Sequence, residues 1–409
     1  MTTSQSTSPV ILVQAASRAW SGAPDWCMNE IDGRPVVAMT IDNAFKEFPD
    51  ADVRIIAPEF DQGGRLDDIP QMFPDKKVSV FYGYDDSPLE RMVASLNGTP
   101  DEDYIIRIDG LHFAWLPEHA NQMLKIAVNE NLDCVKMPDG FPCQLTSDIY
   151  RVSALKQACE MLEDHVNAGI YKVHPKFYMI KNSDKFKCVH YTDHPPIADE
   201  WLSRCREIAK GVYLAGRMQV GESKGFKAGD QLTFHYELAM AYIKPDYRVL
   251  DCACGPGYGA RIIAEKASRV IAADLDIQTV RNASAGTYYD NITFQTADVH
   301  NLNFPDASFD VATSFETIEH VDTDPFFKEL FRVIKPGGLL ILSTPQNSLG
   351  HIPVNSQHLH EFSLEEITNL CSEHFEIVKI TGIKQGRVVF EDDPRGQNTF
   401  IVCRKPENS

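Results

Sequence analysis

The residues best suited to chemistry lie in the second half of the chain, where three acids directly follow short apolar runs: Asp251, Asp274 and Asp298. Asp251 leads into residues 254–259, in which glycine occupies every second position from 255 onward. Glycine permits unusual backbone angles and lets a ligand approach main-chain atoms, and an acid after the second run suits the two hydroxyls of a ribose. The pattern predicts a nucleoside-type ligand, although the loop alone is equally typical of dinucleotide-binding proteins.

Five apolar runs are expected to position these acids: residues 247–250, 270–273, 292–294, 309–315 and 339–343. Helical patterns separate the runs, and Lys-Pro-Gly-Gly precedes the last one. Strands that alternate with helices predict a parallel sheet covered on both faces. The acids then meet at the carboxyl edge of the sheet, where open α/β folds bind their ligands.

This order of loop and acids closely resembles the class I S-adenosylmethionine-dependent methyltransferases, in particular the group that holds ubiquinone-type and glycan-modifying enzymes. The resemblance covers residues 232–404 and implies a Rossmann-like seven-stranded sheet whose last strands, 375–381 and 399–404, form an antiparallel edge. It implies S-adenosylmethionine as the cofactor and S-adenosylhomocysteine as the product. The implied cofactor-binding residues are Asp251, Cys254, Gly255, Gly257, Gly259, Asp274, Leu275, Asp298, Val299 and Phe315.

The same resemblance places the transferred methyl group near the end of the fourth strand, which His320 follows. A sugar hydroxyl is a poor nucleophile and needs a base, for which histidine is suited near neutral pH. His320 is the expected base and His358 the second catalytic candidate; a structural His320 that caps the next helix is the alternative. Glu316, Asn355 and His360 are the expected substrate-binding residues.

Metal-binding and disulfide signals are weak. His351, His358 and His360 lie within ten positions, but His358 and His360 share a face only on a strand, so no metal is expected there and substrate contact or helix capping is preferred. The ten cysteines include no CxxC pair. They indicate reduced thiols in a cytosol rather than a disulfide framework.

The first half has its own alternation of strands and helices, from residue 10 to residue 162. It resembles the cytidylyltransferases of surface-sugar biosynthesis, of the acylneuraminate and spore-coat polysaccharide type. The likeness rests on residues 13–15, 33–37, 87–91 and 104–110, and on 141–150. It implies a nucleotidyltransferase-like (GT-A-like) α/β/α layer domain.

The first half departs from that family in its phosphate and metal residues. The loop after the first strand offers Arg18 and no lysine before Lys46, and the acid expected after Gly110 is replaced by Asp109 before it. Asp148 remains as a metal ligand candidate. With phosphate charge poorly neutralised, we expect Arg18, Asp109 and Asp148 to be a relic nucleotide or metal site, with Mg²⁺ involved only if the domain is active.

The expected fold class is therefore α/β with two domains. The expected boundaries are 1–9 for a disordered tail, 10–194 for the cytidylyltransferase-like domain, 195–231 for a linker and glycine-rich cofactor cover, and 232–409 for the methyltransferase domain. Residues 171–180 and 186–191 are expected to be short closing strands of the first domain.

Composition narrows the partners. The formal net charge of −19 argues against a protein that coats nucleic acid, and no apolar run is long enough to span a bilayer. The polar start lacks the features of a signal peptide, so we expect a cytoplasmic enzyme, acting on a small molecule or glycan and forming a homodimer, if any, through its first domain.

The leading hypothesis is an O-methyltransferase that methylates a sugar, nucleotide sugar or glycan for surface polysaccharide biosynthesis, with a non-catalytic or substrate-binding first domain. One alternative is a bifunctional cytidylyltransferase and methyltransferase that activates and methylates an acidic sugar. Another is a small-molecule methyltransferase whose first domain binds partner proteins. The sequence does not identify the acceptor, the methylated atom, the oligomeric state or the source organism.

Overall fold

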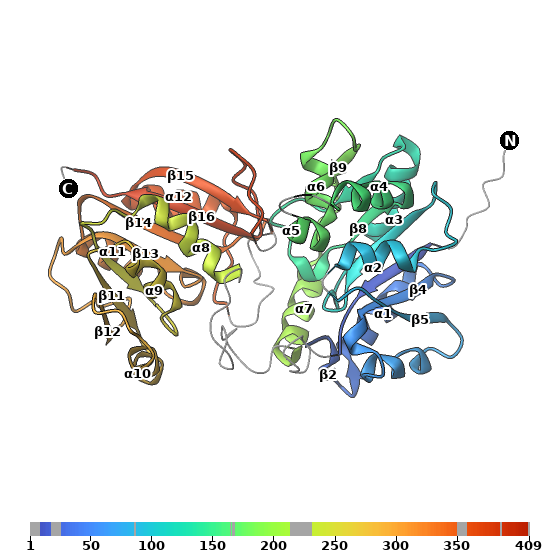
Figure 1. Cartoon of the computed structure of the whole chain (residues 1–409), viewed down its shortest axis with the longest axis horizontal. Coiled ribbons are helices and arrows are strands. Elements are labelled where there is room, and N and C mark those ends of the chain that lie inside the picture. Colours follow the sequence, from blue (N-terminus) through green and yellow to red (C-terminus); the bar gives the residue numbers. More distant parts are fainter. Residues whose placement is uncertain are drawn as a thin grey trace. The chain divides into compact units, whose positions relative to one another are not determined.

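The computed structural model describes residues 9–17, 26–85, 87–163, 165, 168–212, 231–349, 358–384 and 387–407. The chain divides into two compact units, shown in Figure 1. The first comprises Met1–Leu214 with Val354–Ser356, and the second comprises Ala215–Pro353 with Gln357–Ser409. Arg18 and Asn355, two of the predicted site residues, lie outside the described residues, as does most of the expected glycine-rich cover.

A seven-stranded mixed sheet organises the first unit, in the order β5-β4-β1-β6-β8-β7-β9. Its strands are β1 (Val10–Gln14), β4 (Asp52–Pro58), β5 (Lys77–Gly83), β6 (Tyr104–Asp109), β7 (Cys134–Lys136), β8 (Asp148–Arg151) and β9 (Cys188–His190), and β2 (Glu30–Ile31) pairs separately with β3 (Arg34–Pro35). The central strand β1 runs parallel to both neighbours, β4 and β6, and Ile11, Leu12 and Val13 have no exposed surface. A strand buried on both faces requires the continuous apolar run seen in the sequence.

Among the described residues, seven helices belong to the first unit, and a side-chain cap marks the start of α2. The helices are α1 (Val36–Glu47), α2 (Pro88–Ser95), α3 (Pro117–Glu130), α4 (Val152–Met161), α5 (Ala168–Val173), α6 (Pro175–Lys181) and α7 (Asp199–Val212), with 3₁₀ turns η1 (Trp26–Met28), η2 (Glu59–Asp61), η3 (Arg65–Asp68), η4 (Pro70–Met72) and η5 (Cys143–Leu145). At α2, the Ser87 hydroxyl accepts a hydrogen bond from the Glu90 amide and Pro88 occupies the first turn, so the local sequence sets the start of the helix.

The prediction of a strand over residues 171–180 is wrong, because this stretch forms α5 and α6. Tyr171 and Tyr178 pack against each other with ring centroids 5.4 Å apart, and Pro175 occupies the first turn of α6. Residues that read as strand formers are held as helices by this tertiary packing. Farther along the chain, the Trp201 indole of α7 donates a hydrogen bond to the Ala114 carbonyl at 3.1 Å, so α7 packs on the first unit.

The second unit contains the expected seven-stranded sheet, in the order β12-β11-β10-β13-β14-β16-β15. Its strands are β10 (Arg248–Cys252), β11 (Arg269–Asp274), β12 (Ile292–Thr296), β13 (Phe309–Phe315), β14 (Ile334–Pro345), β15 (Glu376–Ile383) and β16 (Asn398–Arg404). Its helices are α8 (Gln231–Ala239), α9 (Tyr258–Ala264), α10 (Ile277–Ala285), α11 (Thr323–Val333) and α12 (Leu364–His374), with 3₁₀ turns η6 (Met240–Tyr242) and η7 (Ile318–His320).

Strand order explains where this unit can bind a ligand. The five strands β12, β11, β10, β13 and β14 are parallel to one another, and β16 and β15 add the expected antiparallel edge. From the central strand β10 the chain continues to β11 and β12 on one side, and β13 and β14 then pair on the other. The loops after β10 and β13 therefore diverge, which opens a crevice at the carboxyl edge in folds of this kind.

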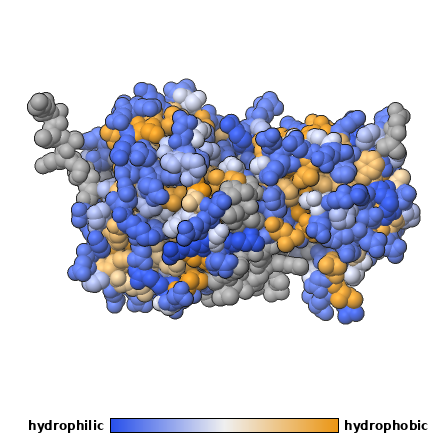
Figure 2. Space-filling model, turned by 180° about the vertical axis from the view of Figure 1, so that it is seen from behind, coloured by the Kyte–Doolittle hydropathy of each residue, from blue (hydrophilic) through white to orange (hydrophobic). Residues whose placement is uncertain are grey.

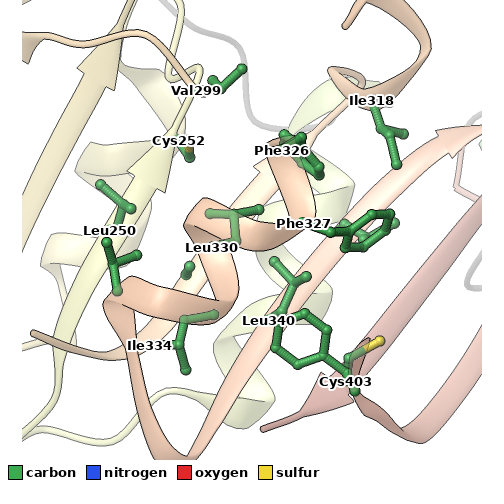
Figure 3. Close-up of a cluster of buried hydrophobic side chains, with 14 of the residues drawn as sticks. Leu250, Cys252, Val299, Ile318, Phe326, Phe327, Leu330, Ile334, Leu340 and Cys403 are labelled. Atoms are coloured by element: carbon green, nitrogen blue, oxygen red, sulfur yellow. The ribbon is translucent and has the colours of Figure 1, made fainter. Parts of the chain in front are cut away.

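Two apolar clusters cover the faces of this sheet. Consecutive residues of β10 point to opposite faces: Val249 packs with residues of α8 and α9, and Leu250 packs with residues of α11. Figure 3 shows the second cluster, in which Phe326 and Leu330 of α11 lie against the strands. Because both faces are filled, only the strand ends and their loops remain for a site.

The surface offers few extended apolar regions on the face drawn in Figure 2, where hydrophilic residues dominate and apolar ones are scattered. No helix among the described residues is long and apolar enough to cross a membrane. Nine of the ten cysteines are free thiols: Cys27, Cys134, Cys159, Cys188, Cys205, Cys252, Cys254, Cys371 and Cys403.

Candidate functional site

The loop after β10 is a sharply bent turn. The φ angle is positive at Ala253 (61°), Gly255 (52°) and Gly257 (77°), which is the left-handed region that side chains disfavour. The Cys254 amide donates to the Ala273 carbonyl at 2.9 Å, and its buried side chain lies in the core. Burial raises the pKa of the Cys254 thiol, so this cysteine is a packing residue and not a thiolate nucleophile.

The three glycines of the loop differ in what a side chain at their position would contact. A Cβ on Gly255 would meet no atom within 4 Å, whereas a Cβ on Gly257 would overlap the Phe294 ring and one on Gly259 would overlap the Tyr236 ring. Gly257 and Gly259 are therefore required by internal packing. Of the three, only Gly255 leaves open space in which a ligand can approach the main chain.

Asp251 is fully buried at the end of β10. It accepts hydrogen bonds from the Tyr236 hydroxyl at 3.1 Å and from the Thr313 hydroxyl at 2.9 Å. Burial raises the pKa of Asp251 to about 7, and the nearby Asp274 adds to this rise, while the two hydroxyl donors act in the opposite direction. Asp251 thus fastens α8 and β13 to β10 beneath the loop.

Asp274 stands at the end of β11 and holds the loop from the side. Its carboxylate accepts the Gly255 amide at 2.9 Å and the Asp276 amide at 3.0 Å, one on each oxygen. A carboxylate oxygen has two lone-pair sites, so each oxygen can still accept a hydroxyl. The acid therefore serves two purposes: it shapes the loop and keeps acceptor capacity for ligand hydroxyls.

Two further predicted residues flank Asp274 at the same edge. Leu275 follows it directly and is 66% exposed, and Asp298 follows β12 with its carboxylate half exposed. Asp298 accepts the His300 amide at 2.9 Å, while the neighbouring Val299 is buried in the core. Single exposed leucines are common on protein surfaces. Leu275 lies between Asp274 and Asp276 in the sequence, and its exposed side chain supplies apolar surface that a flat base can cover.

Phe315 and Glu316 end the neighbouring strand β13. Phe315 is mostly buried and packs edge-on against Tyr236, with ring centroids 4.7 Å apart. Glu316 has φ of 53°, and its carboxylate accepts hydrogen bonds from the Ser343 hydroxyl at 2.8 Å and the Asn398 amide at 2.7 Å. The left-handed backbone conformation is unfavourable for a residue with a side chain, and the two hydrogen bonds of the Glu316 carboxylate help to hold it.

A cluster of histidines and carboxylates lies beyond Glu316. The ligand-type atoms of Glu319, His320 and His358 all lie within 4.8 Å of one another, and the rings of His320 and His358 meet edge-on with centroids 4.9 Å apart. His320 is exposed, whereas Glu319 and His358 are buried. The two catalytic candidates, 38 positions apart in sequence, thus come together.

Several carboxyl groups lie in and beside this cluster. Burial raises the pKa of Glu319 well above its usual range, and the carboxylates of Glu316 and Glu361 add to the rise. Glu319 accepts a hydrogen bond from the Thr344 hydroxyl at 3.0 Å, and His358 Nδ1 lies 2.8 Å from a Glu361 carboxylate oxygen. Helix capping by His320 is not observed, since Asp322 is the N-cap residue of α11.

His360, the remaining described substrate candidate, faces a different neighbour. Its Nε2 lies 3.4 Å from a Glu366 carboxylate oxygen on α12, and its ring packs beside Phe362. It is therefore separate from the triad of Glu319, His320 and His358.

The first unit places Asp148 in a buried network of charges. Lys176 Nζ donates to both Asp148 oxygens at 3.0 Å, and an Arg107 nitrogen lies 3.8 Å from Asp148 and another 3.8 Å from Asp109. Burial alone would raise the pKa of Asp148, but Lys176 and Arg107 outweigh it and lower the pKa. The Lys176 ammonium group thus binds both oxygens of the carboxylate that would have to coordinate a metal ion.

Thr313 and Lys176 were not singled out from the sequence, and the pairing of Glu361 with His358 was not predicted. Thr313 is paired directly opposite Asp251 in the sheet register, so its role follows once the strands are aligned. Glu361 is three residues from His358, a spacing that suits local pairing. Lys176 gave no comparable signal, because its partner Asp148 lies 28 positions away.

Residues 250–342 match the family model described as a methyltransferase domain. This range begins in β10, ends in β14 and includes the loop and all three acids. The second unit carries a class I S-adenosylmethionine-dependent methyltransferase domain.

Curated relatives agree with this assignment. A probable S-adenosylmethionine-dependent methyltransferase of Mycolicibacterium smegmatis is 38% identical over 162 residues, which are 38% of this chain and 62% of the relative. A protein of the same description from Mycobacterium tuberculosis is 36% identical over 159 residues, covering 37% of this chain and 57% of the relative. The 2-methyl-6-phytyl-1,4-hydroquinone methyltransferase of Synechocystis is 34% identical over 162 residues, or 37% and 50% of the two chains. The chain spans between half and two thirds of the length of these relatives.

S-adenosylmethionine is the cofactor of such a domain, and the residues of the carboxyl edge fit it. Gly255 leaves space for a ligand against the main chain, Asp274 keeps acceptor sites for ribose hydroxyls, and Leu275 offers apolar surface for a base. Asp251, in contrast, is fully buried and bonded by side-chain hydroxyls, so it supports the loop from below.

Proposed function

We propose that the protein transfers a methyl group from S-adenosylmethionine to a hydroxyl of a sugar, nucleotide sugar or glycan during cytoplasmic synthesis of a surface polysaccharide. The observation that carries this proposal is the proximity of two features in one sheet. The proposed cofactor residues lie at the ends of β10 and β11, and Glu319 and His320 of the cluster follow β13, which pairs with β10.

The first task of the chain is to position the cofactor, which supplies a methyl group on a positively charged sulfur. Transfer is an in-line displacement, so fixing the two reactants supplies much of the acceleration. Asp274 holds the ribose hydroxyls, Leu275 covers one face of the base, and Asp298 with the following amide reads its polar edge. The buried bonds of Asp251 keep the loop rigid beneath them.

The second task is to promote loss of a proton from the acceptor hydroxyl. The groups placed for this are His320, which is exposed, and His358, which Glu361 holds by its Nδ1. Glu316 is bonded to Ser343 and Asn398 and lines the approach from β13. We place the acceptor hydroxyl at this cluster.

The sugar class of the acceptor is supported by the first unit, whose sequence resembles cytidylyltransferases of surface-sugar synthesis. The relatives do not define it: their names include a phosphoethanolamine N-methyltransferase of Arabidopsis thaliana and a sterol 24-C-methyltransferase of Yarrowia lipolytica. We propose that the first unit binds the sugar nucleotide or the partner protomer of a homodimer and does not transfer nucleotides. The hydrogen bonds from Lys176 to both oxygens of Asp148 support the loss of nucleotidyl transfer, because Asp148 is the candidate metal ligand.

Comparison of a deletion strain with its parent tests the acceptor class. We expect the sugar nucleotides or surface polymer of the deletion strain to lack one O-methyl group. Purified protein with S-adenosylmethionine should then restore it to material from that strain. Restoration of a methyl group on nitrogen or carbon, or on a compound that is not a sugar, would contradict the proposed acceptor but not the methyltransferase.

A further inference from the structure

We propose that Glu319, His320 and His358 bind one divalent transition-metal ion, and that this ion binds and activates the acceptor hydroxyl. The inference rests on the proposed function for its role, but the ion site itself is argued from the side chains alone. It replaces our expectation from the sequence that the histidines of this region bind no metal.

The three side chains provide one carboxylate oxygen and two imidazole nitrogens, all within 4.8 Å of one another. Ligands on one ion at bond lengths of about 2.1 Å lie roughly 3.0–3.4 Å apart, so the cluster must contract by about 1–2 Å. His320 is exposed and can make this movement by turning its side chain. Two histidines and one carboxylate form a recognised donor set for divalent metals that leaves positions open for substrate.

His358 is already oriented for a metal. Its Nδ1 lies 2.8 Å from a Glu361 carboxylate oxygen, and the other Glu361 oxygen accepts a hydrogen bond from the Asn347 amide at 3.0 Å. A carboxylate on Nδ1 fixes the imidazole tautomer with its proton there, which directs the lone pair of Nε2 outward. The arrangement of Asn347, Glu361 and His358 is the outer support that metal-bound histidines usually have.

The local charge also favours a cation. Glu319 is 1% exposed, and a Glu361 carboxylate oxygen lies 2.8 Å from Nδ1 of the neighbouring ligand His358. The Glu319 carboxylate accepts a hydrogen bond from the neutral Thr344 hydroxyl at 3.0 Å. A divalent ion would add positive charge beside the carboxyl groups of Glu319 and Glu361.

A bound ion changes how the hydroxyl loses its proton. Three protein ligands leave coordination positions for the acceptor oxygen, and a divalent metal lowers the pKa of an oxygen bound to it. His320 and His358 would then act as ligands, and a water molecule or buffer base could take the proton. The methyl group would move to the metal-bound oxygen as the bond from carbon to sulfur breaks and the electron pair remains on sulfur.

Metal titration of chelator-treated full-length protein tests the site directly. The probe is Mn²⁺, followed by electron paramagnetic resonance, because the ten cysteines of the chain favour softer ions such as Zn²⁺. We expect one Mn²⁺ per chain. Affinity should fall more than about tenfold in Glu319→Gln and His320→Gln, and about 10–100-fold in Glu361→Gln, which removes only the support of His358.

His360→Gln is the matched control, since His360 is a nearby histidine of the same loop that pairs with Glu366 instead. It should bind Mn²⁺ as the unchanged protein does. His320 is exposed, so its variant is expected to fold, and S-adenosylhomocysteine binding checks this in each case. Absence of Mn²⁺ binding, or equal binding by His320→Gln, would overturn the site.

Activity separates this inference from the proposed function. Methyl transfer by the chelator-treated protein should be lost and should return with Mn²⁺, while S-adenosylhomocysteine affinity stays unchanged. Full methyl transfer in the presence of chelator would overturn the proposed metal site. It would leave the proposed methyltransferase function unaffected. In that event His320 would be the base, as the sequence suggested.

Discussion

Asp251 shows how burial couples the cofactor loop to pH. Its folded pKa of about 7 exceeds the ordinary aspartate value of 3.8, so the folded state binds this proton more tightly than the unfolded state. The stabilisation from the group is fully present below pH ~4 and is lost as pH rises through ~7. At most about 4 kcal/mol is involved, from 1.36 kcal/mol for each unit of pKa.

We therefore expect the stability of the second unit, relative to that of Asp251→Asn, to decrease between pH 5 and pH 8. Urea unfolding followed by circular dichroism measures the free energy of unfolding of both proteins. The contributions of the other titrating groups cancel in the difference between the two values. All four tryptophans, Trp20, Trp26, Trp115 and Trp201, belong to the first unit, so their fluorescence should be unaffected by the substitution. A difference that does not vary with pH would show that Asp251 is ionised throughout.

The loop glycines give a second prediction at the residue scale. Gly257→Ala and Gly259→Ala should lower the melting temperature, because each Cβ overlaps an aromatic ring. Gly255→Ala meets no atom and should cost only the left-handed backbone penalty of about 1–2 kcal/mol, yet weaken S-adenosylhomocysteine binding. Thermal melts and ligand titrations check both. Gly255→Ala with unchanged affinity would mean that the ligand does not approach this atom.

At the scale of elements, one ion pair fastens α6 to β8. Lys176 and Asp148 are both buried, so removing Lys176 takes away the nearest cation of a buried carboxylate and leaves Arg107, at 3.8 Å, beside it. Lys176→Met should destabilise the first unit by about 3–5 kcal/mol, as measured by urea unfolding with tryptophan fluorescence. Lys156→Met on α4 is the control: its pair with Asp101 is exposed, and the expected loss is below about 1 kcal/mol. Equal losses in the two variants would contradict the buried-pair account.

Elements whose signal is local were predictable, and elements that depend on distant partners were not. The strand ends at Asp251, Asp274 and Asp298 follow from apolar runs and turns, and the structure brings them to one edge. Residues 171–180 failed because aromatic residues favour strands in isolation, whereas packing between Tyr171 and Tyr178 favours helices. His320 and His358 were both candidates from the sequence, but their proximity was not predictable, since they lie 38 positions apart and no local pattern links them.

At the scale of the whole molecule, we predict that the second unit catalyses methyl transfer and that the first unit catalyses no nucleotidyl transfer. With CTP, Mg²⁺ and acidic sugars, the protein should release no pyrophosphate, because Lys176 and Arg107 occupy Asp148. Asp109→Asn should leave methyl transfer unchanged, as Asp109 lies in the first unit. Pyrophosphate release that disappears in Asp109→Asn would instead establish a bifunctional cytidylyltransferase and methyltransferase.

The most direct test of the central claim is titration of the purified protein with S-adenosylhomocysteine by calorimetry. We expect a micromolar dissociation constant, about −8 kcal/mol, weakened by about 1.5–3 kcal/mol in Asp274→Ala, which loses the acceptor for the ribose hydroxyls. Asp324→Asn, an exposed acid of α11 paired with Lys328, should bind as the unchanged protein does. No binding by the unchanged protein, or identical curves for it and Asp274→Ala, would contradict the assignment of this edge to the cofactor.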